Sequence, residues 1–119
     1  MVDDEPDARG LIGRLLEEAG AIVLTAGSSA EGLTVLARVR PDILVSDIGM
    51  PDKDGYTFLR RVRQLGPAGG GTVPAVAITT FARAEDRRRA LLSGFQMHLP
   101  KPVEPSELIA VVANVTGRV

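Results

Sequence analysis

Two patterns of hydrophobic residues alternate along this chain, one typical of helices and one typical of buried strands. The helical spacing of apolar residues recurs over residues 7–19, from about 28 to 40, over 56–64 and 84–93, and from 105 onward. Short apolar runs stand between these segments, at 21–26 (AIVLTA), 43–46 (ILVS), 75–79 (AVAIT) and 97–99 (MHL). Strands that are apolar on both faces lie inside a parallel sheet, so the pattern predicts a doubly wound α/β domain.

The boundaries of these segments carry local start and stop signals. Ser28 and Glu31 have the spacing of a capping box, Pro41 follows the second helical segment, and Gly94 follows the fourth. The start of the chain departs from the pattern. Only Met1 and one further apolar residue precede an acidic pair, where a central strand should have about five residues. We therefore expect a truncated first strand.

Composition excludes several classes of protein. A length of 119 residues fits one domain, and a charge of −1 with only four aromatic residues argues against binding nucleic acid. The absence of cysteine excludes a disulfide scaffold, a thiol nucleophile and a cysteine-ligated metal, and a single histidine excludes a His-rich metal site. No apolar run approaches the length of a membrane span, and the chain opens without a secretory leader. We expect a cytoplasmic domain that contacts neither membrane nor nucleic acid directly.

Polar side chains follow the predicted strands one after another. They are Asp3 and Asp4, Asp47, Thr79 and Thr80, and Lys101. The carboxyl ends of parallel strands meet at one edge of the sheet, so these side chains should converge there.

Each of these residues also has an ordinary structural interpretation. Asp3 could cap a helix, Asp47 could begin a turn, and Lys101 could be a solvated loop charge. Three carboxylates gathered together repel one another, however, and this favours a bound cation. A metal site with few protein ligands, all of them oxygen atoms, favours Mg²⁺.

Four motifs in register give the chain its resemblance to a known family. They are 2–6 (VDDEP), 45–55 (VSDIGMPDKDG), 78–82 (ITTFA) and 99–102 (LPKP). The chain resembles the receiver domains of bacterial two-component response regulators, and the segments 84–89 and 94–98 look most like receivers of hybrid sensor histidine kinases. The resemblance implies a flavodoxin-like, five-stranded parallel sheet of order 2-1-3-4-5 with five helices. It also implies a single receiver domain over residues 1–119, possibly cut from a longer chain.

The resemblance further implies roles for individual residues. The nucleophile and phosphorylation site would be Asp47, and Mg²⁺ would be held by Asp3, Asp4, Asp47 and the carbonyl of Gly49. The phosphoryl group would be bound by Lys101, the Thr79 hydroxyl and the amides of Gly49 and Thr80. The switch residues would be Thr79 and His98, and the Lys101–Pro102 bond would be cis. Two departures stand out, because the family usually has alanine where Thr80 stands and tyrosine or phenylalanine where His98 stands.

Partners and alternatives follow from the same resemblance. A sensor histidine kinase or a histidine phosphotransfer domain would donate the phosphoryl group. An output domain or partner protein would read the surface of the fourth helix, fifth strand and fifth helix, and a homodimer is possible. Such a domain catalyses its own phosphorylation and dephosphorylation, without being a turnover enzyme alone.

Three other functions compete with this interpretation. A degenerate receiver would act only as an interaction module, and the intact acidic set argues against it. A phosphohydrolase with an aspartyl nucleophile needs a second aspartate at the position of Gly49. A flavodoxin-type cofactor binder would suffer repulsion between its phosphate and the acidic pair.

Overall fold

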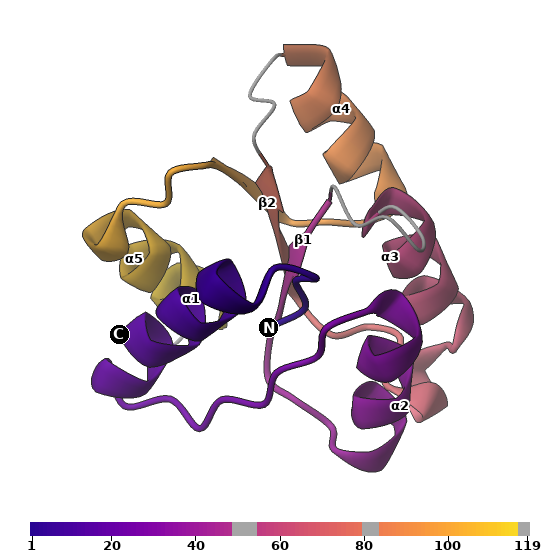
Figure 1. Cartoon of the computed structure of the whole chain (residues 1–119). Coiled ribbons are helices and arrows are strands. Elements are labelled where there is room, and N and C mark those ends of the chain that lie inside the picture. Colours follow the sequence, from indigo (N-terminus) through magenta and orange to yellow (C-terminus); the bar gives the residue numbers. More distant parts are fainter. Residues whose placement is uncertain (49–54, 80–83, 117–119) are drawn as a thin grey trace.

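The computed structural model describes residues 1–48, 55–79 and 84–116, and it arranges them as alternating helices and strands (Figure 1). The elements are α1 (Pro6–Glu18), α2 (Ser29–Arg38), β1 (Leu44–Asp47), α3 (Gly55–Gln64), a 3₁₀ turn η1 (Pro67–Gly69), β2 (Ala75–Thr79), α4 (Ala84–Ser93), β3 (Met97–Pro100) and α5 (Pro105–Thr116). All five predicted helices are present, with bounds within two residues of the predicted ones.

The sheet is parallel, with β1, β2 and β3 side by side in that order. Val2 extends it by single parallel bridges to Ser46 of β1 on one side and to Ala26 on the other. Across the sheet the order of segments is therefore Ala26, Val2, β1, β2, β3. This is the predicted order 2-1-3-4-5, and it confirms the doubly wound fold class.

The prediction of a strand at 21–26 is wrong, and the first predicted strand is too short to count as a full strand. Both are reduced to single bridges at Ala26 and Val2, so the described residues form three full strands in place of the five that we expected. Residues 21–25 pair with no neighbouring described segment as a ladder, and Ile22 among them is 98% exposed.

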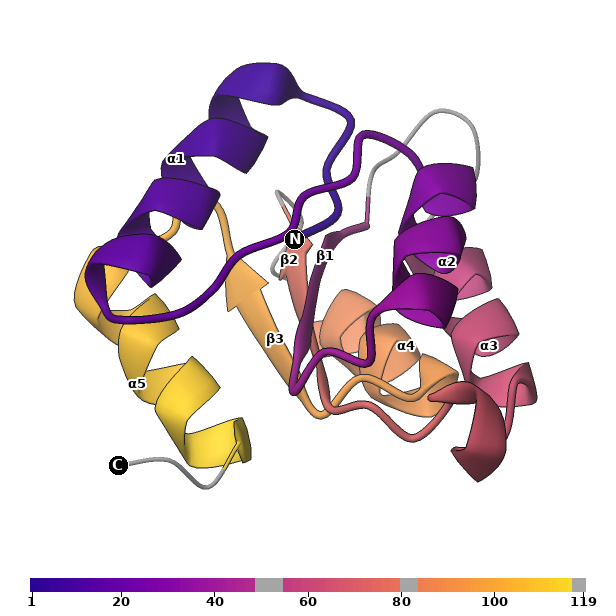
Figure 2. The ribbon, with the colours of Figure 1, turned by 90° about the horizontal axis from the view of Figure 1, so that it is seen from below.

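Helices cover both faces of the sheet (Figure 2). One face packs against α1 and α5 through Ile12, Val45, Ile78 and Leu108, whereas the other packs against α2, α3 and α4. Residues Val76, Ile78 and Ala77 of β2 are fully buried, as expected of a strand covered on both sides.

Local signals explain several helix ends. The Ser28 hydroxyl accepts a hydrogen bond from the Glu31 amide at 3.1 Å, which confirms the predicted cap of α2. Gly94 ends α4 with a φ of 109°, a conformation that favours glycine. The glycine-rich segment 66–71 contains the short η1 turn.

Candidate functional site

Three carboxylates meet at the carboxyl edge of the sheet. Asp47 is the last residue of β1, and Asp3 and Asp4 follow the Val2 bridge. One carboxylate oxygen from each of the three lies within 4.8 Å of the other two. Asp3 is fully buried and Asp47 is nearly so, while Asp4 lies closer to solvent. The convergence predicted from the strand ends is confirmed for these residues.

Lys101 brings a positive charge to the same point. Its Nζ atom lies 3.2 Å from Oδ1 of Asp47 and 3.5 Å from Oδ2 of Asp3, and it donates a hydrogen bond to the latter oxygen. The Lys101 amide also donates to the Thr79 carbonyl at 2.7 Å, which ties the lysine loop to the end of β2. The Lys101–Pro102 bond is cis, as predicted.

Burial and neighbouring charge shift two ionisation equilibria in the site. Burial raises the pKa of the Asp3 carboxyl, and the nearby Asp47 carboxylate adds to the rise, whereas the Glu5 amide and Lys101 oppose it. Burial alone would lower the pKa of Lys101, but the carboxylates of Asp47 and Asp3 outweigh it, so this pKa is raised. One ammonium therefore faces three carboxylates, which leaves an excess of negative charge. Because all the ligand atoms are oxygens, this charge suits Mg²⁺.

The predicted switch residues share one face of the sheet. Thr79 ends β2 and is buried, and His98 lies in β3 opposite Ala77. Partners in a parallel ladder point to the same face, so Thr79 and His98 both face the side of α3 and α4. His98 is half-buried, with its Nε2 atom shielded from solvent. Of the remaining predicted site residues, Gly49 and Thr80 lie outside the described residues.

Two residues that sequence reasoning missed help to shape the site. The Arg9 guanidinium of α1 donates to the Asp3 carbonyl at 2.9 Å, and no pattern in the sequence indicates this contact. Gly55 begins α3 directly against the end of β1. A Cβ atom there would lie 2.6 Å from the Asp47 carbonyl oxygen, so glycine permits this close approach. The motif at 45–55 includes this glycine, but the sequence alone does not show the contact.

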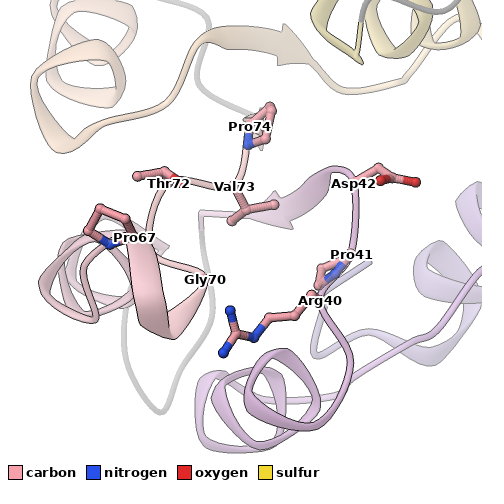
Figure 3. Close-up of a pocket in the computed structure, with 8 residues that line it drawn as sticks. All are labelled: Arg40, Pro41, Asp42, Pro67, Gly70, Thr72, Val73 and Pro74. Atoms are coloured by element: carbon pink, nitrogen blue, oxygen red, sulfur yellow. The ribbon is translucent and has the colours of Figure 1, made fainter.

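A separate surface pocket lies at the opposite edge of the sheet (Figure 3). It has a volume of about 350 Å³ and is lined by residues before β1 and β2, among them Arg40, Asp42 and Pro74. Since it lies at the amino ends of these strands, it is not part of the acidic site.

Comparisons with known proteins agree with this geometry. The family model of the response regulator receiver domain matches residues 1–113. An uncharacterized 14.6 kDa protein of Leptolyngbya boryana is 50% identical over 112 residues, covering 94% of this chain and 84% of that protein. The sensor histidine kinase RcsC of Salmonella typhi is 39% identical over 119 residues, covering all of this chain but only 12% of the kinase.

A solved structure shows the same fold. A response regulator of Chloroflexus aurantiacus superposes with a TM-score of 0.91 at 33% identity, covering 98% of this chain and 94% of that one. Within the described residues, no helix is both long enough and apolar enough to cross a membrane.

Proposed function

The chain belongs to the family of response regulator receiver domains, the phosphoacceptor domains of two-component systems, and we propose that Asp47 is its phosphorylation site. The observation that carries this proposal is the position of Asp47. Its carboxylate lies 3.2 Å from the Lys101 ammonium and beside the carboxylates of Asp3 and Asp4. A phosphoacceptor needs this combination, because the transferred group brings spreading negative charge that must be neutralised.

In the proposed reaction an Asp47 carboxylate oxygen attacks the phosphorus of a phosphohistidine. The new P–O bond forms as the P–N bond breaks, and the histidine nitrogen keeps the electron pair. The product is an acyl phosphate on Asp47 and a free histidine on the donor. Lys101 pairs with a phosphoryl oxygen, and the Thr79 hydroxyl donates to another.

Receiver domains of this family generally depend on Mg²⁺, and we propose that Asp3, Asp4 and Asp47 hold it here, with the Gly49 carbonyl as a further ligand. When bound, the ion neutralises charge on the phosphoryl oxygens. The Glu5 amide donates to Oδ1 of Asp3 at 3.0 Å and holds that carboxylate in place. Lys101 keeps Asp3 and Asp47 close together before the ion arrives.

The switch in this proposal runs from Thr79 to His98. A phosphoryl group on Asp47 draws the Thr79 hydroxyl toward it, and His98, on the same face, follows into the space beside α4. The surface of α4, β3 and α5 then changes and is read by an output domain or a partner protein. The amide of Thr80 would complete the binding of the phosphoryl group.

Family membership implies interaction with histidine kinases and output domains. We propose that a cytoplasmic sensor kinase module or a histidine phosphotransfer domain supplies the phosphoryl group. The chain spans 12% of RcsC, and the segments 84–89 and 94–98 favour a place in a hybrid kinase of that kind. Kinase activity itself would belong to the rest of such a protein.

Intact mass spectrometry tests this function. The chain is incubated with a small phosphoramidate, with Mg²⁺ or with a chelator, beside the variant Asp47→Asn and the matched control Asp42→Asn. We expect one phosphoryl group per chain in the parent and in the control, only with Mg²⁺, and none in Asp47→Asn. A parent that takes no phosphoryl group under any condition would instead be a degenerate receiver.

A further inference from the structure

Arg9, in the first turn of α1, contacts the backbone of the acidic segment and has no part in the reaction proposed above. Its half-buried guanidinium donates to the Asp3 carbonyl at 2.9 Å. The same Nη1 atom lies against the turn before α2, because a Cβ on Gly27 would be only 2.7 Å from it. The Gly27 amide in turn donates to Oε2 of Glu31 at 3.2 Å. Arg9 therefore joins α1, the acidic segment and the start of α2.

Asp3 is held at each of its polar atoms. Its amide donates to the Ala26 carbonyl at 3.1 Å, and its carbonyl accepts the hydrogen bond from Arg9. Its Oδ1 atom accepts from the Glu5 amide at 3.0 Å, and its Oδ2 atom accepts from Lys101 at 3.5 Å. These contacts fix the orientation of the Asp3 carboxylate.

Asp4 is held differently, through its backbone neighbours. Its carboxylate lies closer to solvent, and among the described residues no hydrogen bond or ion pair holds it. Its direction therefore depends on the two planar peptide groups that flank it. The plane before Asp4 contains the Asp3 carbonyl, which Arg9 holds, and the plane after it contains the Glu5 amide, which Oδ1 of Asp3 holds.

We propose that Arg9 is a positioning residue for the Mg²⁺ site. By holding the peptide plane between Asp3 and Asp4, it orients the Asp4 carboxylate toward the ion. This inference rests on the proposed function, because it takes Asp3, Asp4 and Asp47 as the ligands of Mg²⁺. Groups that orient metal ligands from behind typically change metal affinity by about 10- to 100-fold.

The positive charge of Arg9 has the opposite effect on metal binding. The guanidinium lies 2.9 Å from the carbonyl oxygen of a ligand residue, so it repels a divalent cation at the site. If Arg9 acted only through its charge, its removal would lower the Kd of Mg²⁺. The positioning role requires that the Kd rises instead. The sign of the change therefore separates the two roles.

Two variants break the contact from opposite sides. Arg9→Met removes the donor and keeps much of the apolar stem. Gly27→Ala keeps every charge, but its new Cβ would lie 2.7 Å from Nη1 of Arg9 and would displace the guanidinium from the Asp3 carbonyl. The φ of Gly27 is not positive, so alanine fits the backbone there. The matched controls are Arg14→Met, which removes an exposed arginine of the same helix, and Gly10→Ala, whose new Cβ would meet no atom within 4 Å.

The measurement is the Kd of Mg²⁺, taken from backbone amide shifts in an NMR titration of the whole chain. Thermal melts in a chelator check that each variant is folded. We expect the Kd to rise about tenfold in Arg9→Met and in Gly27→Ala, and to change by less than about twofold in the controls. The double variant should bind no more weakly than Arg9→Met, because both changes break one contact. Arg9→Lys, which keeps a donor, should regain part of the lost affinity.

The outcomes distinguish this inference from the proposed function. An unchanged or lower Kd in both Arg9→Met and Gly27→Ala would overturn the positioning role and leave the metal site intact. Additive losses in the double variant would overturn it as well, because the two residues would then act separately. A parent whose amide shifts do not respond to Mg²⁺ would instead refute the proposed metal site, and the positioning role with it. If Arg9→Met fails to fold, Gly27→Ala decides the question, since only the flexible end of the arginine must move.

Discussion

Removing one carboxylate from the acidic cluster should stabilise the metal-free protein and abolish its response to Mg²⁺. Asp4→Asn is the cleanest such change, because Lys101 contacts Asp3 and Asp47. Asp4 can be neutralised without breaking either of those ion pairs. The variant keeps an oxygen acceptor of the same shape but loses its charge.

The distances set the size of the effect. The carboxylate oxygens of Asp3 and Asp47 lie within 4.8 Å of that of Asp4. At the dielectric constant of water, each pair at such a distance repels by about 0.9 kcal/mol, so two pairs amount to roughly 1–2 kcal/mol. For a domain of this size that corresponds to a rise in Tm of about 4–8 °C without metal. Because Asp4 lies closer to solvent, 1 M salt should shrink the difference.

Mg²⁺ should reverse the order of the two proteins. A ligand at a hundredfold excess over its Kd stabilises the parent by about 2.7 kcal/mol, and the variant should gain almost nothing. Thermal melts in a chelator and across a Mg²⁺ titration, with Glu18→Gln as a control for losing one distant charge, measure both effects. An Asp4→Asn protein that melts lower than the parent in chelator, and still gains as much from Mg²⁺, would refute the metal site.

Three further predictions concern other contacts. The pKa of Lys101 is raised, so its ion pairs stabilise the fold fully below about pH 10.4, and this stabilisation is lost as the pH rises through the folded-state pKa. Urea unfolding from pH 8 to 11 should show the loss in the parent but not in Lys101→Met. Arg63→Ala should lower the free energy of unfolding by about 2–4 kcal/mol, because the guanidinium donates to the Gly94 carbonyl at 2.7 Å and to two other carbonyls. Phosphorylation of the refolded protein should stay unchanged, and a large loss of phosphorylation would contradict a purely structural role. Gly55→Ala should slow phosphorylation more than it lowers Tm, because the new Cβ would lie 2.6 Å from the Asp47 carbonyl oxygen. Equal phosphorylation rates of the variant and the parent, measured by intact mass, would show that the contact relaxes freely.

The parts of the fold that follow from local signals could be predicted from the sequence. Residues 75–79 form a buried strand because 75–78 are apolar throughout and the polar Thr79 ends the run. The cap at Ser28 and the end of α4 at Gly94 depend on a few neighbouring residues, and both were predicted. The segment 21–26 has equal strand character, but its pairing depends on a partner strand that is distant in sequence and only one bridge long.

The site could be predicted as a set of residues, but its contacts could not. Strand ends meet at one edge by topology, and this placed Asp3, Asp47 and Lys101 together. Which carboxylate Lys101 approaches more closely depends on the packing of the loop after β3, 54 positions away from Asp47. The hydrogen bonds of Arg63 to Gly94 join residues 31 positions apart and left no pattern in the sequence.

The most direct test of the central claim is to map the acyl phosphate to a residue. After incubation with a phosphoramidate and Mg²⁺, borohydride reduction converts an aspartyl phosphate to homoserine, and fragmentation of the tryptic peptide that spans residues 39–53 locates it. We predict homoserine at position 47 alone, absent when Mg²⁺ is chelated. Homoserine at position 42, or at position 3 or 4 in the tryptic peptide of residues 1–9, would contradict the assignment of Asp47 as the phosphoacceptor. A phosphoryl group retained on His98 with position 47 unmodified would contradict it as well.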